Sequence, residues 1–472
     1  MRNNLWIVVD TIATAAVSLL TVLLLARFVD PESFGLASLI IGATLLVNLY
    51  VEGLFHDALI QNRDGDDSLF ALALWLVLAT ALGLVLLSLA GWVVLSAYGQ
   101  GQLGGMIVAV AASLPFSAIV GVNNARERHR LSYRKVAIAS IGGRTFACAM
   151  ALLMGVLGWE VWSLLLQVTI TSATQALLLI ALIRWFPGPA FNVGALGGLL
   201  RFALPYALMH TVAGLRLQVF TFLLAGFSGL AAAGYLNVAF RLTITPQTVL
   251  NTALMNFGFP LLSARKGSKA DLTTAFATVT MIACVGGAAP FVGLALVAPA
   301  LVPVAFGPGW DGVVLPVQVL CIGAAIGFLR INGSFLLRAL GHVRYSLYNA
   351  LFQLAATVAA MAVIRPEDAM GGALIWAAPV LLTAPLTWTV VARVAGIGPF
   401  EQARNMAGPV AAILLMVAAV MTFEAAVPLP PVASIIASSA IGGMALLVAL
   451  YATNKEVRQF AERFFGRQRP AE

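Results

Sequence analysis

The chain is poor in charged residues. Asp, Glu, Lys and Arg make up 10% of its 472 residues, against about 25% in soluble globular domains. The polar stretches between apolar runs reach about twenty residues at most, which leaves no room for a soluble domain. Only three cysteines are present, Cys148, Cys284 and Cys321, all inside apolar stretches without motif spacing. These shortages exclude an ordinary water-soluble protein, and they indicate neither a disulfide framework nor a metal site.

The chain consists mainly of long hydrophobic runs. Hydrophobic residues make up 61% of the chain, and a helix that crosses a bilayer needs about 20 mostly apolar residues. We therefore predict an all-α integral membrane protein with about fourteen transmembrane helices. The first is expected to be a permanent span, because it is longer than the apolar part of a signal peptide. The predicted spans are residues 5–29, 35–59, 69–94, 103–124, 135–157, 159–183, 202–227, 231–257, 272–298, 312–337, 345–364, 369–392, 404–424 and 432–453.

The basic residues of the turns predict an orientation. With a cytoplasmic N-terminus, 21 of the 27 Lys and Arg residues fall in cytoplasmic connections or in the C-terminal tail, and only Arg27 and Arg365 fall outside. Cytoplasmic loops of membrane proteins carry such an excess, so both termini are predicted to be cytoplasmic. The basic, amphipathic residues 457–467 are expected to lie on the lipids of the inner leaflet. The net charge of +8 follows from this topology and does not require a nucleic acid partner.

A weak internal repeat predicts how the spans are grouped. Ala26, Phe28 and Gly35 match Ala225, Phe227 and Gly234 at an offset of 199 residues. Two six-helix lobes of the same orientation imply a pseudo-twofold axis along the membrane normal and a cavity between the lobes. The predicted division is an N-terminal lobe over 1–190, a C-terminal lobe over 191–396, and two additional helices with a basic tail over 397–472.

Four arginines interrupt the predicted spans: Arg144, Arg216, Arg241 and Arg330. An arginine at the centre of a membrane helix costs about 2.5–3.5 kcal/mol on insertion scales, so each needs a partner or a hydrated surrounding. The planar guanidinium suits bidentate binding of phosphate and carboxylate groups. The arginines therefore favour an anionic cargo in a hydrated cavity, although each could instead form a structural ion pair with an acid inside the spans.

The helical repeat ranks these arginines as substrate-binding candidates. Arg241 is the strongest, because it shares one face of its span with polar residues that include Asn237 and Asn251. Arg144 and Arg330 follow, since small residues share their faces. Arg216 is the weakest, because it points away from the polar face of its own span unless Gly214 distorts the helix. The predicted substrate-binding residues are Arg241, Arg330, Arg144, Arg216, Asn237 and Asn251.

The acidic residues inside the spans are Asp10, Glu52 and Asp57, all in the first two spans. Carboxylates inside a membrane can couple transport to a proton or sodium gradient. They can equally serve as counter-ions for the arginines, and both roles stay open. No catalytic residue, metal site or cofactor is predicted.

Several short motifs then carry a family resemblance. They are residues 26–36 (ARFVDPESFGL), 58–61 (ALIQ), 234–239 (GYLNVA), 259–263 (FPLLS), 307–310 (GPGW) and 338–341 (RALG). Their order and the count of fourteen spans resemble the polysaccharide transporter family of Wzx-type flippases, within the multidrug/oligosaccharidyl-lipid/polysaccharide exporter superfamily. The resemblance covers about residues 5–350. Phe55, His56 and Asp57 depart from it, because family members usually carry small residues there.

The resemblance implies a fold and a function. The fold is the two-lobed bundle of the multidrug and toxin extrusion (MATE) transporters. The function is the translocation of undecaprenyl-pyrophosphate-linked oligosaccharide repeat units across the bacterial inner membrane by alternating access, for exopolysaccharide, capsule or lipopolysaccharide O-antigen synthesis. It also implies a cationic central cavity and, as functional partners, a polysaccharide polymerase and glycosyltransferases.

Three other functions compete with this interpretation. A multidrug exporter of the same superfamily usually carries cations. Its cavity should be rich in acids and aromatics, whereas the spans of this chain contain more arginines than acids. A flippase for lipid II or for a teichuronic acid precursor differs less and is harder to separate. A membrane polymerase or ligase for polysaccharide would be an enzyme with a long outer loop, and the predicted outer turns are short. The expected protein is therefore a transporter and not an enzyme.

Overall fold

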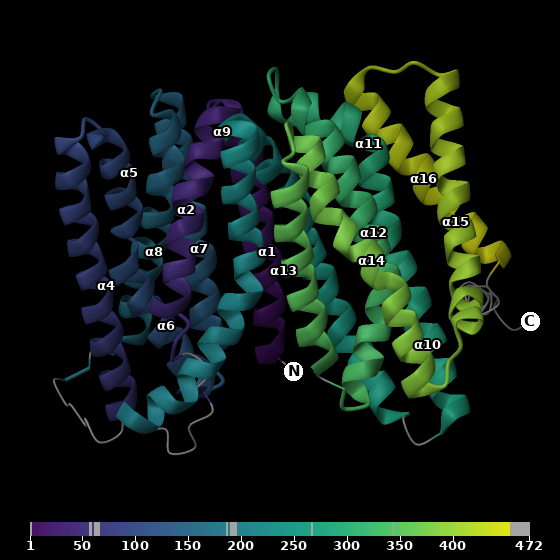
Figure 1. The fold of residues 1–472 in the computed structure, drawn as a ribbon, viewed down its shortest axis with the longest axis horizontal. Coiled ribbons are helices and arrows are strands. Elements are labelled where there is room, and N and C mark those ends of the chain that lie inside the picture. Colours follow the sequence, from purple (N-terminus) through teal and green to yellow (C-terminus); the bar gives the residue numbers. More distant parts are fainter. Residues whose placement is uncertain are drawn as a thin grey trace, which may run out of the picture. The chain divides into compact units, whose positions relative to one another are not determined.

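The structure is a computed structural model that describes residues 2–55, 59–60, 67–185, 187–188, 196–265, 268–342 and 344–453. Every regular element within these residues is a helix (Figure 1). A helix satisfies its own backbone hydrogen bonds, which is the requirement that a lipid surrounding places on a spanning segment. The predicted all-α fold is confirmed for the described part of the chain.

Thirteen helices in the described residues are long and apolar enough to cross a membrane. One of them, α9 (Leu196–Ala264), contains a residue with non-helical backbone angles, Gly229, at φ 86° and ψ 170°. Glycine reaches this positive φ without the penalty that a side chain imposes. The break separates α9 into two parts, which correspond to the predicted spans 202–227 and 231–257. The prediction of about fourteen spans is therefore confirmed.

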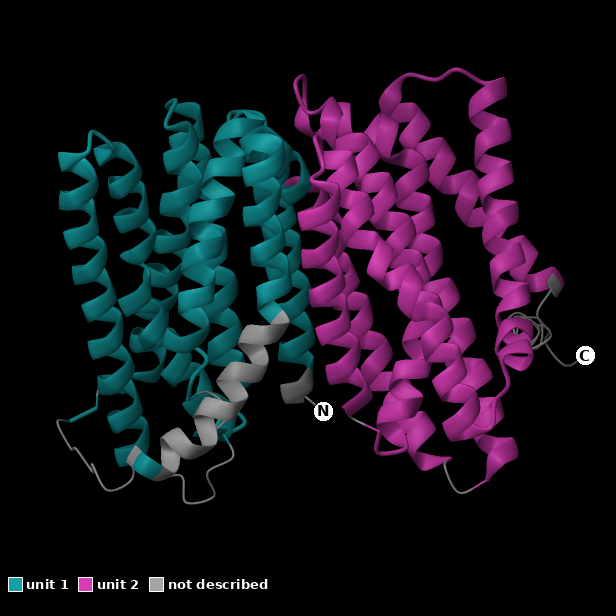
Figure 2. Cartoon of the chain, in the orientation of Figure 1, with its two compact units in different colours: residues 1–237 teal, residues 238–472 magenta. Residues whose placement is uncertain are grey.

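The contacts within the chain group it into two units, residues 1–237 and residues 238–472 (Figure 2). The boundary lies inside α9, just beyond its break. The predicted lobes over 1–190 and 191–396, with two further helices over 397–472, rest on sequence symmetry, which this grouping does not test. That division stays a prediction.

In the first unit, helices pack against the next helix in the sequence and against helices further away in the sequence. α7 packs on α8 and on α1, α4 packs on α5 and α6, and α2 packs on α8. α5 and α6 are separated only by a turn at Ala112 and Ser113 and together form one membrane-length segment. The helices are α1 (Arg2–Leu25), α2 (Pro31–Val51), α4 (Asp67–Ala97), α5 (Gly101–Ala111), α6 (Leu114–His129), α7 (Tyr133–Val156), α8 (Glu160–Ile183) and the first part of α9.

The second unit has the same construction. α12 packs on α14 and α11, and α15 packs on α16. A π-helical turn, η2 (Cys284–Ala288), joins α10 to α11, so that Gly287 packs directly against the ring of Phe328. The other elements are α10 (Lys269–Ala283), α11 (Ala289–Phe306), η3 (Asp311–Val313), α12 (Val314–Ala339), α13 (Arg344–Ile364), α14 (Ala369–Ala395), α15 (Pro399–Ala426) and α16 (Pro431–Thr453). The predicted amphipathic tail over 457–467 lies outside the described residues.

Candidate functional site

Arg144 lies on α7 and faces α1 in the first unit. Its Nη1 donates a hydrogen bond of 2.9 Å to the Ser18 hydroxyl. Within the described residues, no carboxylate lies within the 4.0 Å of an ion pair with this guanidinium. The side chain is more than one third exposed, so Arg144 lines a surface that an anion could reach.

Two of the three predicted acidic residues lie near Arg144 without pairing with it directly. The Ser140 hydroxyl donates to the Asp10 carboxylate, and the Asn48 side-chain amide donates to Glu52 Oε2 at 3.2 Å. Arg144 attracts both carboxylates electrostatically. Asp10 and Glu52 therefore reduce the excess charge around Arg144, but they leave its guanidinium free to bind an anion. The third acid, Asp57, lies outside the described residues, as does His56.

Arg128 is a member of this cluster that the sequence analysis did not assign. It lies in the last turn of α6 and attracts both Asp10 and Glu52. In the sequence it is one of five basic residues in a single turn, and no periodicity distinguishes it from the others. The tertiary structure identifies it, because α6 packs against α2 and Gly121 lies on the backbone of Glu52, which caps the end of α2.

Arg330 lies on α12 in the second unit, and neutral side chains surround it. Nη1 donates to Asn349 Oδ1 at 3.3 Å and to Thr387 Oγ1 at 3.5 Å. The Tyr345 hydroxyl bonds to the same Thr387 hydroxyl at 2.6 Å and also interacts with Arg330. These partners come from α13 and α14, so the contact that joins α12, α13 and α14 holds the guanidinium in place.

The partners of Arg330 leave its charge uncompensated. The three neutral oxygens accept hydrogen bonds but carry no net charge, and no carboxylate pairs with Arg330 among the described residues. Its Nε is buried and has no hydrogen-bond partner in that part of the chain. A cation in a low-dielectric surrounding is stabilised strongly by an anion. The Arg330 cluster, defined as Arg330, Tyr345, Asn349 and Thr387, can therefore bind an anionic group.

The other predicted residues lie along α9. Arg216 is in the first part of this helix, and the backbone at Gly214 is helical, so no distortion there redirects the side chain. Asn237, Arg241 and Asn251 follow in the second part and are partly buried. Arg144 and Arg216 thus belong to the first unit, and Arg241 and Arg330 to the second. Their convergence on one cationic cavity stays a prediction.

A second ionic cluster lies at one end of the first unit. Arg126 is 5% exposed and binds Asp67 through two hydrogen bonds of 3.0 Å, from Nε and from Nη2. Arg130 adds a third contact to Asp67 at 3.1 Å, and the Arg126 guanidinium stacks on Trp185 at 4.5 Å. These groups join α4, α6 and the chain beyond α8. Because the buried guanidinium of Arg126 is already paired with the Asp67 carboxylate, this cluster is structural and not a binding site.

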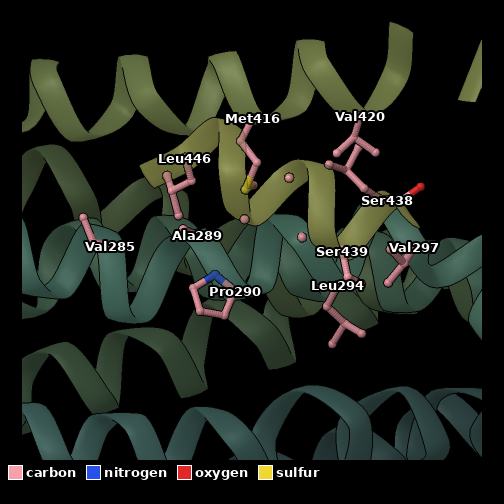
Figure 3. Close-up of a pocket in the computed structure, with 14 residues that line it drawn as sticks. Val285, Ala289, Pro290, Leu294, Val297, Met416, Val420, Ser438, Ser439 and Leu446 are labelled. Atoms are coloured by element: carbon pink, nitrogen blue, oxygen red, sulfur yellow. The ribbon is translucent and has the colours of Figure 1, made fainter. Parts of the chain in front are cut away.

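An apolar pocket of about 380 Å³ lies in the second unit between α11, α15 and α16 (Figure 3). Its walls are aliphatic and small side chains, with Leu294, Met416, Val420 and Leu446 among them. None of the predicted site residues lines it. Among the described residues no group of three His, Cys, Asp or Glu side chains is placed to hold a metal ion.

Comparisons with known proteins agree with this architecture. A sequence profile of the family described as "Polysaccharide biosynthesis protein" matches residues 24–315. The chain is 25% identical to the succinoglycan biosynthesis transport protein ExoT of Rhizobium meliloti (strain 1021), over 97% of this chain and 93% of that protein.

Solved structures of other proteins share the fold. The lipid II flippase MurJ, in an inward closed conformation, superposes with a TM-score of 0.78 at 12% identity and covers 95% of this chain and 98% of its own. An inward-facing multidrug resistance MATE transporter superposes with a TM-score of 0.56 at 14% identity, over 83% of this chain and 99% of its own. These likenesses confirm the predicted MATE-like fold.

Proposed function

We propose, from the premise that this chain belongs to the polysaccharide biosynthesis protein family, that it flips an anionic, lipid-linked oligosaccharide across a membrane. The chain is a multi-pass membrane protein of a transporter family, and it is not an enzyme. The proposed cargo is an undecaprenyl-pyrophosphate-linked repeat unit for exopolysaccharide, capsule or O-antigen synthesis. The name of ExoT, a succinoglycan transport protein, supports a polysaccharide precursor as cargo.

The observation that carries the proposal is the Arg330 cluster. Arg330 lies inside a membrane span and is held by the neutral side chains of Asn349, Thr387 and Tyr345, so no carboxylate in the described part of the chain compensates its charge. A structural ion pair would have placed a carboxylate beside it. A pyrophosphate supplies the missing negative charge and accepts hydrogen bonds from a guanidinium. Arg144, which is bonded to a serine and is exposed, supports the same cargo from the first unit.

The remaining parts of the proposal follow from the topology. Alternating access presents the cargo site to one side of the membrane and then to the other. The proposed location is the bacterial inner membrane, with both termini in the cytoplasm, because cytoplasmic loops carry an excess of basic residues. A proton or sodium gradient is the proposed energy source, and a polysaccharide polymerase and glycosyltransferases are the proposed functional partners.

A second candidate cargo is a lipid II-type precursor, favoured by the close structural likeness to MurJ. It also carries a pyrophosphate, so the arginines do not distinguish the two. A cationic drug, the cargo expected of a multidrug exporter, is less suited to an arginine that no carboxylate compensates. A flipping assay that compares several lipid-linked sugars therefore decides between the first two cargoes.

The experiment uses purified protein in liposomes that contain a fluorescent, pyrophosphate-linked oligosaccharide. Arg330→Ala should reduce the flipping rate by about tenfold or more, since losing a charge-assisted hydrogen bond costs roughly 1.5–3 kcal/mol. Arg330→Lys should retain part of the rate, because it keeps the charge without the bidentate geometry. Arg393→Ala is the control, because this exposed arginine lies in the last turn of α14. Undiminished flipping by Arg330→Ala would remove the cargo site from this cluster.

A further inference from the structure

Two glycines that the internal repeat pairs in sequence also meet in space. Gly35 on α2 and Gly234 on the second part of α9 are 199 residues apart, the offset of the repeat. A Cβ atom on Gly35 would overlap the carbonyl oxygen of Leu230 and stand 3.1 Å from the Gly234 nitrogen. A Cβ atom on Gly234 would overlap the carbonyl oxygen of Pro31 and stand 3.0 Å from the Gly35 nitrogen. The two helices therefore touch backbone to backbone.

The contact is reciprocal in the way that a twofold axis requires. Gly35 contacts Leu230, and Gly234 contacts Pro31. Pro31 and Leu230 are themselves separated by the offset of 199 residues. In an interface with twofold symmetry, residue i contacts residue j and residue j contacts residue i. The weak sequence repeat therefore has a local structural counterpart at this crossing.

The crossing lies in a dry part of the first unit. Leu25 and Val29, at the end of α1, are almost fully buried, as are Phe34 and Ala37 at the start of α2. Ala233, beside the second glycine, is 1% exposed. The three atoms nearest to a Cβ at either glycine are all backbone atoms, so the two helices meet there without an intervening side chain.

We propose that this Gly35–Gly234 crossing is a gate that seals one end of the transport path and opens during the cycle. The inference rests on the proposed function only in assuming alternating access. The break at Gly229, directly before the crossing, gives the second part of α9 a point about which to move. The contacts within the chain place both glycines in the first unit. The predicted lobe boundary at residue 190 places them in different lobes, and the proposed gate follows these predicted lobes.

The test adds one methyl group to the crossing and measures water access. Thr14 lies on α1 four residues from both Asp10 and Ser18, whose side chains contact Ser140 and Arg144 on α7. It is changed to Cys as a reporter in a Cys148→Ala background. A membrane-impermeant maleimide is then applied from each side. Tyr98→Cys marks the relevant side, because Tyr98 is 82% exposed in the turn between α4 and α5, at the same end of the first unit as the start of α2 (Figure 1).

Gly35→Ala and Gly234→Ala should each increase labelling of Thr14→Cys from that side by at least about fivefold. Overpacking typically costs about 1–3 kcal/mol, which shifts a two-state equilibrium by this factor or more. The double variant should label little more than either single variant, because both methyl groups break the same contact. Gly83→Ala is the matched control, since a Cβ there has open space on α4.

Unchanged labelling of both alanine variants, or an equal increase with Gly83→Ala, would overturn the gate. If the alanine variants do not insert, cysteines at Phe34 and Ala233, each next to one of the two glycines in the sequence, are treated with a short bismaleimide. We expect cross-linking, together with loss of labelling at Thr14→Cys from the Tyr98 side. Cross-linking that leaves this labelling unchanged, or no cross-linking, would also overturn the gate. Labelling needs no cargo, so a failed flipping assay with intact labelling changes would reject the cargo and keep the gate.

Discussion

Single residues show how this protein carries charge inside a membrane. Arg144 and Arg330 are held by hydroxyl and amide oxygens, whereas Arg126 is bound by a carboxylate. A neutral partner positions a guanidinium and leaves its charge available, while a carboxylate cancels it. This difference separates the arginines proposed to bind cargo from the one that stabilises the fold.

The paired arginine gives a prediction about stability. Asp67→Asn should lower the free energy of unfolding by about 1–3 kcal/mol, because Arg126 stays buried without a counter-ion. This loss of unfolding free energy should be smaller than the loss on breaking a fully buried ion pair, because Asp67 is 49% exposed and Arg130 is at the surface. Thermal unfolding in detergent measures the change. Asp271→Asn, an exposed acid in the first turn of α10, is the control and should unfold at the wild-type temperature.

At the scale of the element, helix ends depend on polar caps. Asp30 precedes α2 and accepts hydrogen bonds from the backbone N–H groups of Glu32 at 2.9 Å and Ser33 at 3.0 Å. Pro31 follows as the first helical residue, where no N–H group is needed. The start of α2 is therefore fixed locally, which positions the Gly35–Gly234 crossing one turn further on.

Replacing the Asp30 cap is expected to lower the free energy of unfolding by an amount that depends on pH. Asp30→Ala should cost about 0.5–2 kcal/mol, and Asp30→Asn much less, because asparagine also caps helices. Partial burial acts to raise the pKa of Asp30, but the hydrogen bonds from Ser33 and Glu32 outweigh it and hold the pKa below its ordinary value. The ionised cap therefore contributes fully above the ordinary pKa, and its contribution is lost as the pH falls through the lowered one.

Unfolding temperatures of wild type and Asp30→Ala, measured from neutral to acidic pH, test this prediction. The difference between them should narrow in acid. Glu32→Ala is the control, because Glu32 is exposed in the same turn and its carboxylate caps no backbone N–H group in the described structure. A constant difference across the pH range would show that the charge of Asp30 does not contribute.

For the whole molecule, the main prediction concerns the energy source. Asp10 and Glu52 interact with the same two arginines, Arg128 and Arg144. If these acids couple transport, Asp10→Asn or Glu52→Gln should abolish the dependence of flipping on a proton or sodium gradient. Flipping in liposomes with and without each gradient measures this dependence. Glu160→Gln, an exposed acid in the first turn of α8, is the control. Unchanged gradient dependence would leave both acids as counter-ions.

The fold could be predicted because its main determinant is local. A segment of about 20 apolar residues has only one way to satisfy its backbone in lipid, so the helices follow from composition and length. The candidate site could be inferred from the sequence only in part, and its role in binding stays a prediction. Arg144 and Arg330 were found because a charge inside an apolar run is visible in the sequence itself. Arg128, Tyr345 and Thr387 were missed, because nothing in a turn of basic residues or in an apolar helix distinguishes them.

By itself, the sequence determined the helices, their number and the positions of the charges inside them. These features depend on the transfer of each segment from water into lipid, which its own composition and length decide. Only the tertiary structure decided which charges are compensated. The partner of Arg126 lies 59 residues away in the sequence, and one partner of Arg330 lies 57 residues away. The tertiary structure also turned a weak repeat into a contact, because Gly35 and Gly234 touch only when two distant helices cross. Long-range packing brings these groups together, and no local pattern encodes it.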